Sequence, residues 1–319
     1  MKLLRGESAQ FLKDRGIVAT IGNFDGVHLG HQELLRTLKE RAEQFNLPMA
    51  VILFEPQPRE YFNKTSSCAR LSSLREKLDN LKNCAVDVVY CLRFNRKIAE
   101  MSASTFAHDF LFTKLNVKLL LVGEDFRFGK NREGDTLLLR AVAQEYNAQV
   151  EIFENFNIHG ERISSTSIRN ALSVGDLTQA ALGMGRPYHI CGRVIHGNKR
   201  GREWGIPTAN LALNRSEVAL RGVFVVQVVL SSGAKLFGVA NIGRRPTIDG
   251  NKLILEVHLF DFADNIYGEF IQVIFLHKIR DEVKFSSLET LIAQIHQDIQ
   301  VAKEFVTNLT ISQCGGSNG

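Results

Sequence analysis

One stretch decides the fold of the first half of this chain: Gly22-Asn23-Phe24-Asp25-Gly26-Val27-His28-Leu29-Gly30-His31. A short apolar run at residues 17–21 precedes it. After it, apolar side chains recur at helical spacing, at Leu34, Leu35, Leu38, Ala42 and Phe45. The pattern therefore predicts a strand, a glycine-rich turn and a helix in direct succession.

The turn itself combines features that favour phosphate. Its glycines allow a sharp bend and a close approach of the backbone to a ligand, and the helix N-terminus offers unpaired N–H groups and a partial positive charge. His28 and His31 stand at this opening. The alternative is a strand-to-helix turn that binds no nucleotide, with both histidines packed or solvated.

Size and composition indicate a globular protein of two domains, because the chain has 319 residues of which 45% are hydrophobic and 23% charged. No apolar run is long enough to cross a bilayer, and the N-terminus lacks the apolar core of a signal peptide, so we expect a cytoplasmic protein without a membrane partner. The five cysteines include no C-x-x-C pair. That spacing argues against a disulfide framework and against a thiolate metal site.

The charge balance points to small anions rather than to polyanions. A net charge of +5 suits an anionic ligand but is too diffuse to indicate nucleic acid, so we predict no nucleic-acid partner. The densest basic cluster is Lys199-Arg200-Gly201-Arg202. A cluster this short is most often a solvated loop.

The chain up to about residue 185 alternates between apolar runs and helical periodicity. The predicted strands lie at 17–21, 50–54, 86–92, 119–122 and 150–153, and predicted helices at 74–81, 98–111 and 137–146. Apolar strands separated by helices indicate an α/β fold with a parallel sheet covered on both faces. In such sheets ligands bind beyond the carboxyl ends of the strands.

Two further loops are expected at that edge. The first, residues 123–130, places Asp125 and two bases directly after a strand. The second, residues 163–169, carries four hydroxyls before Arg169. One hydroxyl suffices to cap a helix, so the surplus resembles an anion site with Arg169 as a bidentate phosphate ligand. A plain helix cap is the alternative.

The pattern changes near residues 183–187. Beyond it, β-like runs at 190–195, 223–230, 235–242, 253–262 and 270–276 indicate an antiparallel barrel. A helix with a capping box at Ser286 and Glu289 closes it, and the small polar residues after Cys314 are expected to fray. We therefore divide the chain into domains at 1–184 and 185–308, followed by a flexible tail at 309–319.

One glycine-rich basic segment of the barrel half, residues 192–210, can wrap a polyphosphate. In it, Thr208 and Asn210 supply the neutral oxygens that Mg²⁺ accepts alongside phosphate. A surface loop without a ligand is the alternative. Glu256 lies within an otherwise apolar run. It either sits on the wet face of a strand or points into the barrel as a general base with a raised pKa.

Over nearly its whole length the chain resembles the prokaryotic bifunctional riboflavin kinase/FAD synthetase family. The matching motifs of the first half are the G-x-F-D-G-x-H-x-G-H turn at 22–31, Gly123-Glu124-Asp125-Phe126-Arg127-Phe128-Gly129 and Ser164-Ser165-Thr166-Ser167-Ile168-Arg169. Those of the second half are Gly205-Ile206-Pro207-Thr208-Ala209-Asn210, residues 238–247, Glu256-Val257-His258-Leu259 and residues 280–285. Asp125 stands where some members carry Asn, and Glu203-Trp204 where a smaller or apolar residue is more usual.

The resemblance implies a Rossmann-like nucleotidylyltransferase domain that joins FMN to the adenylyl group of ATP, giving FAD and pyrophosphate. His28 and His31 would then be catalytic, donating hydrogen bonds to the reacting phosphates. The implied ATP and phosphate ligands of this domain are Gly22, Phe24, Asp25, Gly30, Asp125, Ser164, Thr166 and Arg169.

For the barrel, the resemblance implies a riboflavin kinase that makes FMN and ADP from riboflavin and ATP. Glu256 would accept the proton, Thr208 and Asn210 would hold Mg²⁺, and Asn241 and Arg280 would bind the flavin. The implied phosphate ligands are Gly197, Lys199, Arg200, Gly201, Arg202, Gly205 and Pro207. Residues 280–285 resemble the loop that covers the flavin.

Two other hypotheses use the same residues. In one, the first domain adenylylates a different substrate and the barrel is an accessory. In the other, the barrel binds oligonucleotides through Lys199, Arg200 and Arg202, although the loop lacks the interleaved aromatics that stack bases. The sequence leaves the oligomeric state open, and it marks no flavin pocket in the first domain.

Overall fold

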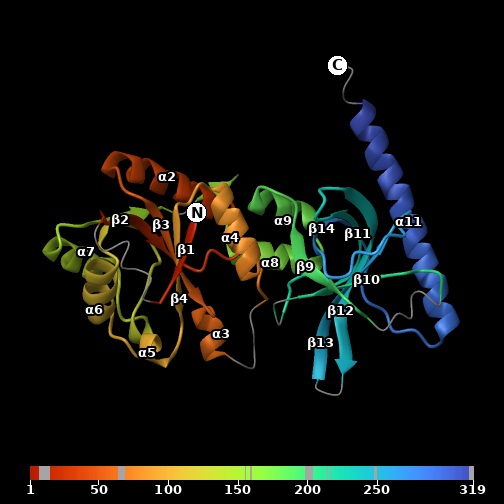
Figure 1. The fold of residues 1–319 in the computed structure, drawn as a ribbon, viewed down its shortest axis with the longest axis horizontal. Coiled ribbons are helices and arrows are strands. Elements are labelled where there is room, and N and C mark those ends of the chain that lie inside the picture. Colours follow the sequence, from red (N-terminus) through yellow and green to blue (C-terminus); the bar gives the residue numbers. More distant parts are fainter. Residues whose placement is uncertain are drawn as a thin grey trace. The chain divides into compact units, whose positions relative to one another are not determined.

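The computed structural model describes residues 1–6, 15–63, 69–154, 156–158, 160–197, 204–213, 215, 217–247 and 250–315. The chain forms two compact units (Figure 1). Unit 1 comprises Met1–Cys68 and Ser72–Ser165, and unit 2 comprises Ala69–Leu71 and Thr166–Gly319. The helices between residues 165 and 184 belong to unit 2 because one of them packs on a barrel strand.

Unit 1 is built on a parallel sheet of six strands in the order β1-β4-β3-β2-β5-β6. The strands are β1 (Lys2–Arg5), β2 (Ile17–Ile21), β3 (Met49–Glu55), β4 (Val88–Arg93), β5 (Val117–Gly123) and β6 (Gln149–Phe153). The five strands predicted from the sequence are all present. The strand β1 was not predicted, because its four residues are largely exposed and show no apolar run.

Helices cover both faces of this sheet, as the apolar strands predicted. Ile17, Ala19 and Ile21 of β2 pack toward η1 (Phe106–Lys114) and α7 (Thr136–Glu145). The intervening Val18 packs on the other face, toward α2 (Leu29–Phe45) and α4 (Leu74–Asn83). The alternation of a strand therefore divides its side chains between two cores.

The helix predicted at 98–111 is broken into shorter pieces. The structure has α5 (Arg96–Ala99), α6 (Ala103–Thr105) and then η1. The break falls where the Ser102 hydroxyl accepts a hydrogen bond from the Thr105 N–H and starts a new helix. The remaining elements of unit 1 are α3 (Pro58–Phe62), η2 (Lys130–Arg132) and the hairpin of β7 (Asn157–Ile158) and β8 (Glu161–Arg162).

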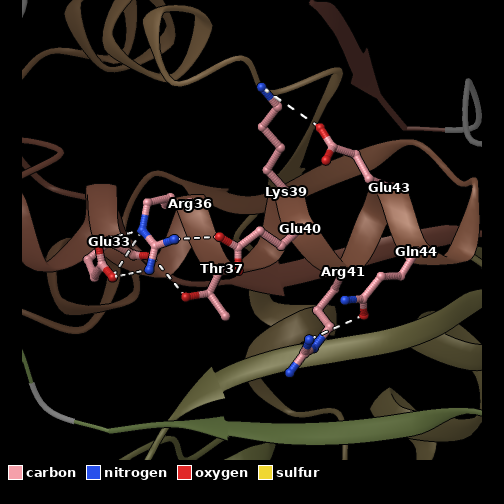
Figure 2. Close-up of polar contacts among 8 residues, drawn as sticks. All are labelled: Glu33, Arg36, Thr37, Lys39, Glu40, Arg41, Glu43 and Gln44. Carbon is pink, nitrogen blue, oxygen red and sulfur yellow. Dashed lines mark hydrogen bonds and ion pairs between the residues drawn. The ribbon is translucent and has the colours of Figure 1, made fainter.

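The outward face of α2 carries pairs of opposite charge (Figure 2). Arg36 forms ion pairs with Glu33 at 2.6 Å and with Glu40 one turn further on. Pairs three and four residues apart stabilise a helix from its solvent side. The opposite face, with Leu34, Leu35 and Leu38, is buried against the sheet.

Unit 2 is a closed antiparallel barrel in the order β10-β13-β12-β11-β14-β9. Its strands are β9 (His189–Ile195), β10 (Ala209–Ala212), β11 (Gly222–Val229), β12 (Lys235–Thr247), β13 (Gly250–Leu259) and β14 (Phe270–Arg280). The helices are α8 (Ser165–Val174), α9 (Leu177–Met184) and α11 (Leu288–Gly315). The predicted fold class, a parallel α/β domain followed by an antiparallel barrel and a closing helix, is confirmed.

The closing helix differs from the prediction at both ends. Ser287, not Ser286, caps it, because the Ser287 hydroxyl accepts the Thr290 N–H at 3.3 Å. The same hydroxyl lowers the pKa of the Glu289 carboxyl by hydrogen bonding. At the other end α11 continues to Gly315, past residue 308 where the sequence predicts a tail. Figure 1 shows α11 alongside the barrel.

Alternation along β11 decides which residues fill the barrel and which meet α11. Phe224, Val226 and Val228 are fully buried. The intervening Val223 and Val225 belong instead to a cluster with Ala302 of α11. The helix thus covers part of the outer wall of the barrel.

Candidate functional site

Three of the predicted site residues of unit 2 form a row across adjacent strands. Glu256 of β13 pairs in register with Asn210 of β10 on one side and with Asn241 of β12 on the other. Side chains directly opposite in neighbouring strands have Cβ atoms ~5 Å apart. A carboxylate therefore stands between two carboxamides on one face of the barrel wall.

This row faces outward, which decides between the two orientations that the sequence left open for Glu256. Leu255, Val257 and Leu259 are buried in the barrel, so Glu256 and His258 point to the other face of β13. That face is not open solvent, because α11 and the segment before it cover it. Glu256 lines a cavity of about 400 Å³ on the outside of the barrel.

The cavity joins apolar walls to a few polar groups. Thr208, Asn210, Asn241 and Glu256 line one side. The apolar lining comes from the barrel wall and from α11: Ile206, Val223, Val239, Ile254, Leu291, Ile295 and Ile299. This composition suits a flat apolar ring system with a polar tail, since ligand sites are mostly apolar with a few fixed polar groups.

Gly197 leaves room for the Asn210 side chain of this row. A Cβ on Gly197 would overlap the carboxamide of Asn210, so the lack of a side chain there lets Asn210 take its place. Pro207 is also fixed, because the Nδ1 of His258 lies 2.9 Å from the Pro207 carbonyl and donates to it. Gly205 has a φ of 73°, which glycine adopts without strain. The predicted ligands Lys199, Arg200, Gly201 and Arg202 lie outside the described residues.

Arg280 lines the same cavity, but its guanidinium is already engaged. It donates to both carboxylate oxygens of Asp298 on α11. The sequence analysis missed Asp298, because an acidic residue in an amphipathic helix ordinarily faces water. Its only sequence signal is a position between the apolar residues Ile295 and Ile299.

In unit 1 the glycine-rich turn is held in an unusual backbone conformation. Phe24 and Val27 have positive φ values of 46° and 42°, and Gly26 has a φ of 81°. Left-handed backbone is a real strain for a β-branched residue, and such strain gathers at functional sites. The turn follows β2 and leads directly into α2.

Asp25 holds this turn from inside. Its side chain is only 2% exposed, and its carboxylate accepts the Ser72 N–H at 3.1 Å. The Ser72 hydroxyl accepts the Gly26 N–H at 3.0 Å, and the Ser165 hydroxyl donates to the Asp25 carbonyl at 3.0 Å. The carboxylate of Asp25 is thus buried and engaged by Ser72. Ser72 was missed because a lone serine far along the chain gives no sequence signal.

The two histidines lie together at the start of α2. His28 is the N-cap residue, and its Nδ1 accepts the His31 N–H at 3.3 Å. That bond leaves the proton of neutral His28 on Nε2. The two rings stack with centroids 3.6 Å apart. Gly30 permits this, because a Cβ there would lie 3.3 Å from the His28 ring.

His31 is held neutral by its surroundings. Burial, the neighbouring His28 and the buried Lys77 all lower the pKa of His31 well below its ordinary value. The Nδ1 atom of His31 is buried and has no hydrogen-bond partner among the residues that the structure describes. A neutral imidazole donates one hydrogen bond and carries no charge.

The other predicted ligands of the first half are placed as follows. Asp125 follows β5, and its exposed carboxylate forms an ion pair with Arg162 at 2.8 Å. Gly22 continues the sheet by donating to the Ile52 carbonyl. Ser164 belongs to unit 1, whereas Thr166 and Arg169 belong to unit 2. There Arg169 donates to the Ala69 carbonyl at 2.7 Å.

Comparisons with known proteins match both halves of the chain. The family model described as FAD synthetase matches residues 11–167, and the one described as riboflavin kinase matches residues 184–306. A bifunctional riboflavin kinase/FMN adenylyltransferase of Haemophilus influenzae is 49% identical over 96% of this chain and 99% of its own length. Its counterpart in Escherichia coli K12 is 48% identical over 96% of this chain and 98% of its own. The chain belongs to the bifunctional riboflavin kinase/FMN adenylyltransferase family.

A solved structure supports the same fold for this family member. A crystal structure of a protein named macrolide-efflux protein, from Streptococcus pneumoniae, has a TM-score of 0.76 to this chain. The two are 30% identical, and the match covers 94% of this chain and 98% of that one. In the described part of the present chain, no helix has the length and apolar character that a membrane crossing requires.

Proposed function

We infer that this chain makes FAD from riboflavin in two ATP-dependent steps, one in each unit. The observation that carries the first step is the row of Asn210, Glu256 and Asn241 on the wall of the outer cavity. The second step rests on the paired His28 and His31 at the N-terminus of α2. Both agree with the activities named by the two family models.

In the kinase step, the terminal hydroxyl of riboflavin attacks the γ-phosphorus of ATP, and ADP leaves. Glu256 accepts the hydroxyl proton, since it is the carboxylate of the row. The apolar walls hold the isoalloxazine ring and so bring the hydroxyl to Glu256, because phosphoryl transfer depends mainly on positioning and charge neutralisation.

The cavity fits a magnesium ion. Although no cluster of three or more His, Cys, Asp or Glu side chains is arranged to hold a metal among the described residues, Thr208 and Asn210 offer neutral oxygens in the same cavity as Glu256. Hard oxygen ligands of this kind, completed by phosphate, are what Mg²⁺ prefers. When bound, the ion neutralises charge on the transferring phosphoryl group.

In the adenylylation step, the phosphate of FMN attacks the α-phosphorus of a second ATP, and pyrophosphate leaves. The FMN phosphate is largely dianionic near pH 7, because its second pKa is about 6, so no base is required. His28 and His31 donate hydrogen bonds, His31 as a neutral imidazole because its pKa is lowered, and the N-terminus of α2 adds its positive end. Gly22, Phe24 and Gly30 shape the turn.

Three residues keep their proposed phosphate-binding roles from the family resemblance alone: Ser164, Thr166 and Arg169. For Asp25 we propose a different role, as the buried anchor of the turn, because its carboxylate is engaged by Ser72. Asp125 is proposed to act in ligand binding through its exposed carboxylate. We also propose a cytoplasmic location, which the free thiol of the buried Cys91 supports.

The test is chromatography of flavins after incubation with ATP and Mg²⁺. Glu256→Ala is expected to stop FMN formation from riboflavin while added FMN is still converted to FAD. His28→Ala is expected to do the reverse, so that FMN accumulates without FAD. Glu304→Gln, an exposed position on α11, is the matched control for the carboxylate variant. Equal loss of both activities in either variant would contradict the assignment of one activity to each unit.

A further inference from the structure

We propose that Asp298 of α11 is a positioning residue of the kinase site: it holds Arg280, and through Arg280 it sets the place of residues 281–285 over the cavity. We name residues 281–285 the strap. The inference rests on the proposed function, because it assigns Asp298 to riboflavin binding in that same cavity.

The pairing of Asp298 with Arg280 is close and buried. Asp298 is 3% exposed. Its carboxylate accepts Arg280 Nε at 2.9 Å on Oδ1 and Arg280 Nη2 at 2.8 Å on Oδ2, and it also accepts Gln294 Nε2 at 3.0 Å. Two parallel N–H···O bonds between a guanidinium and a carboxylate fix the geometry of both groups. A buried carboxylate is tolerated only with such partners.

The same guanidinium contacts both ends of the strap. Its Nη1 donates to the carbonyl of Asp281 at 3.0 Å. The ring of Phe285 lies with its centroid 5.7 Å from the Arg280 guanidinium carbon, within the range of a cation–π contact. Arg280 thus folds the strap back on itself, and Asp298 fixes the orientation of Arg280.

The backbone of Arg280 gives the strap a rigid base. Arg280 ends β14 and pairs with Val223 of β11. A Cβ on the adjacent Gly222 would overlap the Arg280 carbonyl, so the two strands meet closely there. The far side of the strap reaches β12, where a Cβ on Gly243 would overlap the Glu282 carboxylate. The strap therefore spans the cavity from β14 to β12.

The strap covers the apolar part of the cavity. Val283 and Phe285 line it together with Ile295 and Ile299 of α11. An isoalloxazine ring is buried by such walls, whereas a triphosphate requires polar and charged groups. A displaced strap should therefore weaken the binding of riboflavin and leave that of ATP.

The test is steady-state kinetics of the full-length protein with the variants Asp298→Asn, Arg280→Gln and the double variant. We expect Asp298→Asn to raise the KM for riboflavin roughly 10-fold, the size of one lost hydrogen bond to a charged group, with kcat and the KM for ATP changed much less. Because Asp298 acts only through Arg280, the double variant should show the same riboflavin KM as Arg280→Gln alone. Asp264→Asn, an exposed aspartate in unit 2, is the matched control.

The outcomes separate the inference from the function on which it rests. If the wild-type protein forms no FMN from riboflavin, the proposed function fails. If it forms FMN but Asp298→Asn keeps the riboflavin KM, raises both KM values equally, or adds its effect to that of Arg280→Gln, the positioning role alone fails. Should Asp298→Asn unfold unit 2, seen as a lost thermal transition, Arg280→Lys keeps the charge without the fork and must show the same selective rise.

Discussion

At the scale of single residues, the kinase site depends on contacts that only one residue type permits. Gly197 shows this most clearly, because any side chain there meets the carboxamide of Asn210. Gly197, which the sequence assigns to a phosphate-binding loop, therefore also affects the position of Asn210. It makes room for a residue that we propose to hold the metal.

Gly197→Ala is therefore expected to raise the Mg²⁺ concentration needed for half-maximal kinase activity, because Asn210 must shift. The adenylylation of added FMN should stay the same. Gly123→Ala is the control for kinase activity, since a Cβ at Gly123 meets nothing within 4 Å. If Gly197→Ala needs the same Mg²⁺ concentration as the wild type, the proposed role of Asn210 as a metal ligand is contradicted.

The lowered pKa of His31 predicts a pH-dependent stability. In the unfolded chain His31 takes up a proton near pH 6.5, whereas in the folded protein it stays neutral to a lower pH. The unfolded state then binds more protons, so stability falls as the pH drops below 6.5 and is unaffected above it.

His31→Gln removes this difference. Measured as thermal unfolding midpoints at pH 7.5 and 5.5, the variant should lose less stability on acidification than the wild type does. His296→Ala, an exposed histidine of α11, should behave as the wild type does. If the unfolding midpoints of the wild type and of His31→Gln fall equally between pH 7.5 and 5.5, the conclusion that folding lowers the pKa of His31 is contradicted.

At the scale of elements, the turn between β2 and α2 is fixed by a residue from elsewhere in the chain. Ser72 stands just before α4, yet its hydroxyl and N–H hold Gly26 and Asp25 in place. A strained turn persists only where its surroundings impose it.

Ser72→Ala should therefore impair adenylylation, because it leaves the Gly26 N–H without its acceptor at a cost of about 1–3 kcal/mol. We expect FAD formation from FMN to fall by roughly tenfold or more, with riboflavin phosphorylation unchanged. Ser231→Ala, in an exposed turn of unit 2, serves as the control. Full adenylylation activity of Ser72→Ala would show that the turn keeps its shape without this bond.

The elements also show how far sequence reasoning reaches. Apolar runs and helical periodicity predicted five of the six strands of the parallel sheet and five of the six strands of the barrel, because burial on one or two faces leaves a local pattern. β10 was missed, since four residues after Pro207 carry no pattern of their own. Its pairing with β13, which brings Asn210 beside Glu256, is a contact between distant segments.

The same limit explains why the sequence left two orientations of Glu256 open. Alternation along β13 shows that Glu256 lies on the face opposite to Leu255 and Val257, but it does not show what covers that face. Only the packing of α11 turns an outward carboxylate into a cavity residue. The role of Asp298 was not predicted for a related reason, because its partner Arg280 lies on a different element, β14.

At the scale of the whole molecule, we propose that two compact units joined in one chain carry out two reactions. The units differ in fold and in chemistry. Unit 1 offers imidazole donors at a helix N-terminus, and unit 2 offers a carboxylate and amides on a barrel wall. Because His28 and His31 belong to unit 1 and Glu256 belongs to unit 2, the loss of either group should leave the other reaction intact.

Complementation tests this claim most directly. Glu256→Ala protein and His28→Ala protein are each incubated with riboflavin, ATP and Mg²⁺, alone and mixed in equal amounts, and the flavins are separated by chromatography. We expect no FAD from either variant alone and FAD from the mixture, because the FMN that His28→Ala protein releases is adenylylated by Glu256→Ala protein. FAD from either variant alone, or none from the mixture, would contradict this claim.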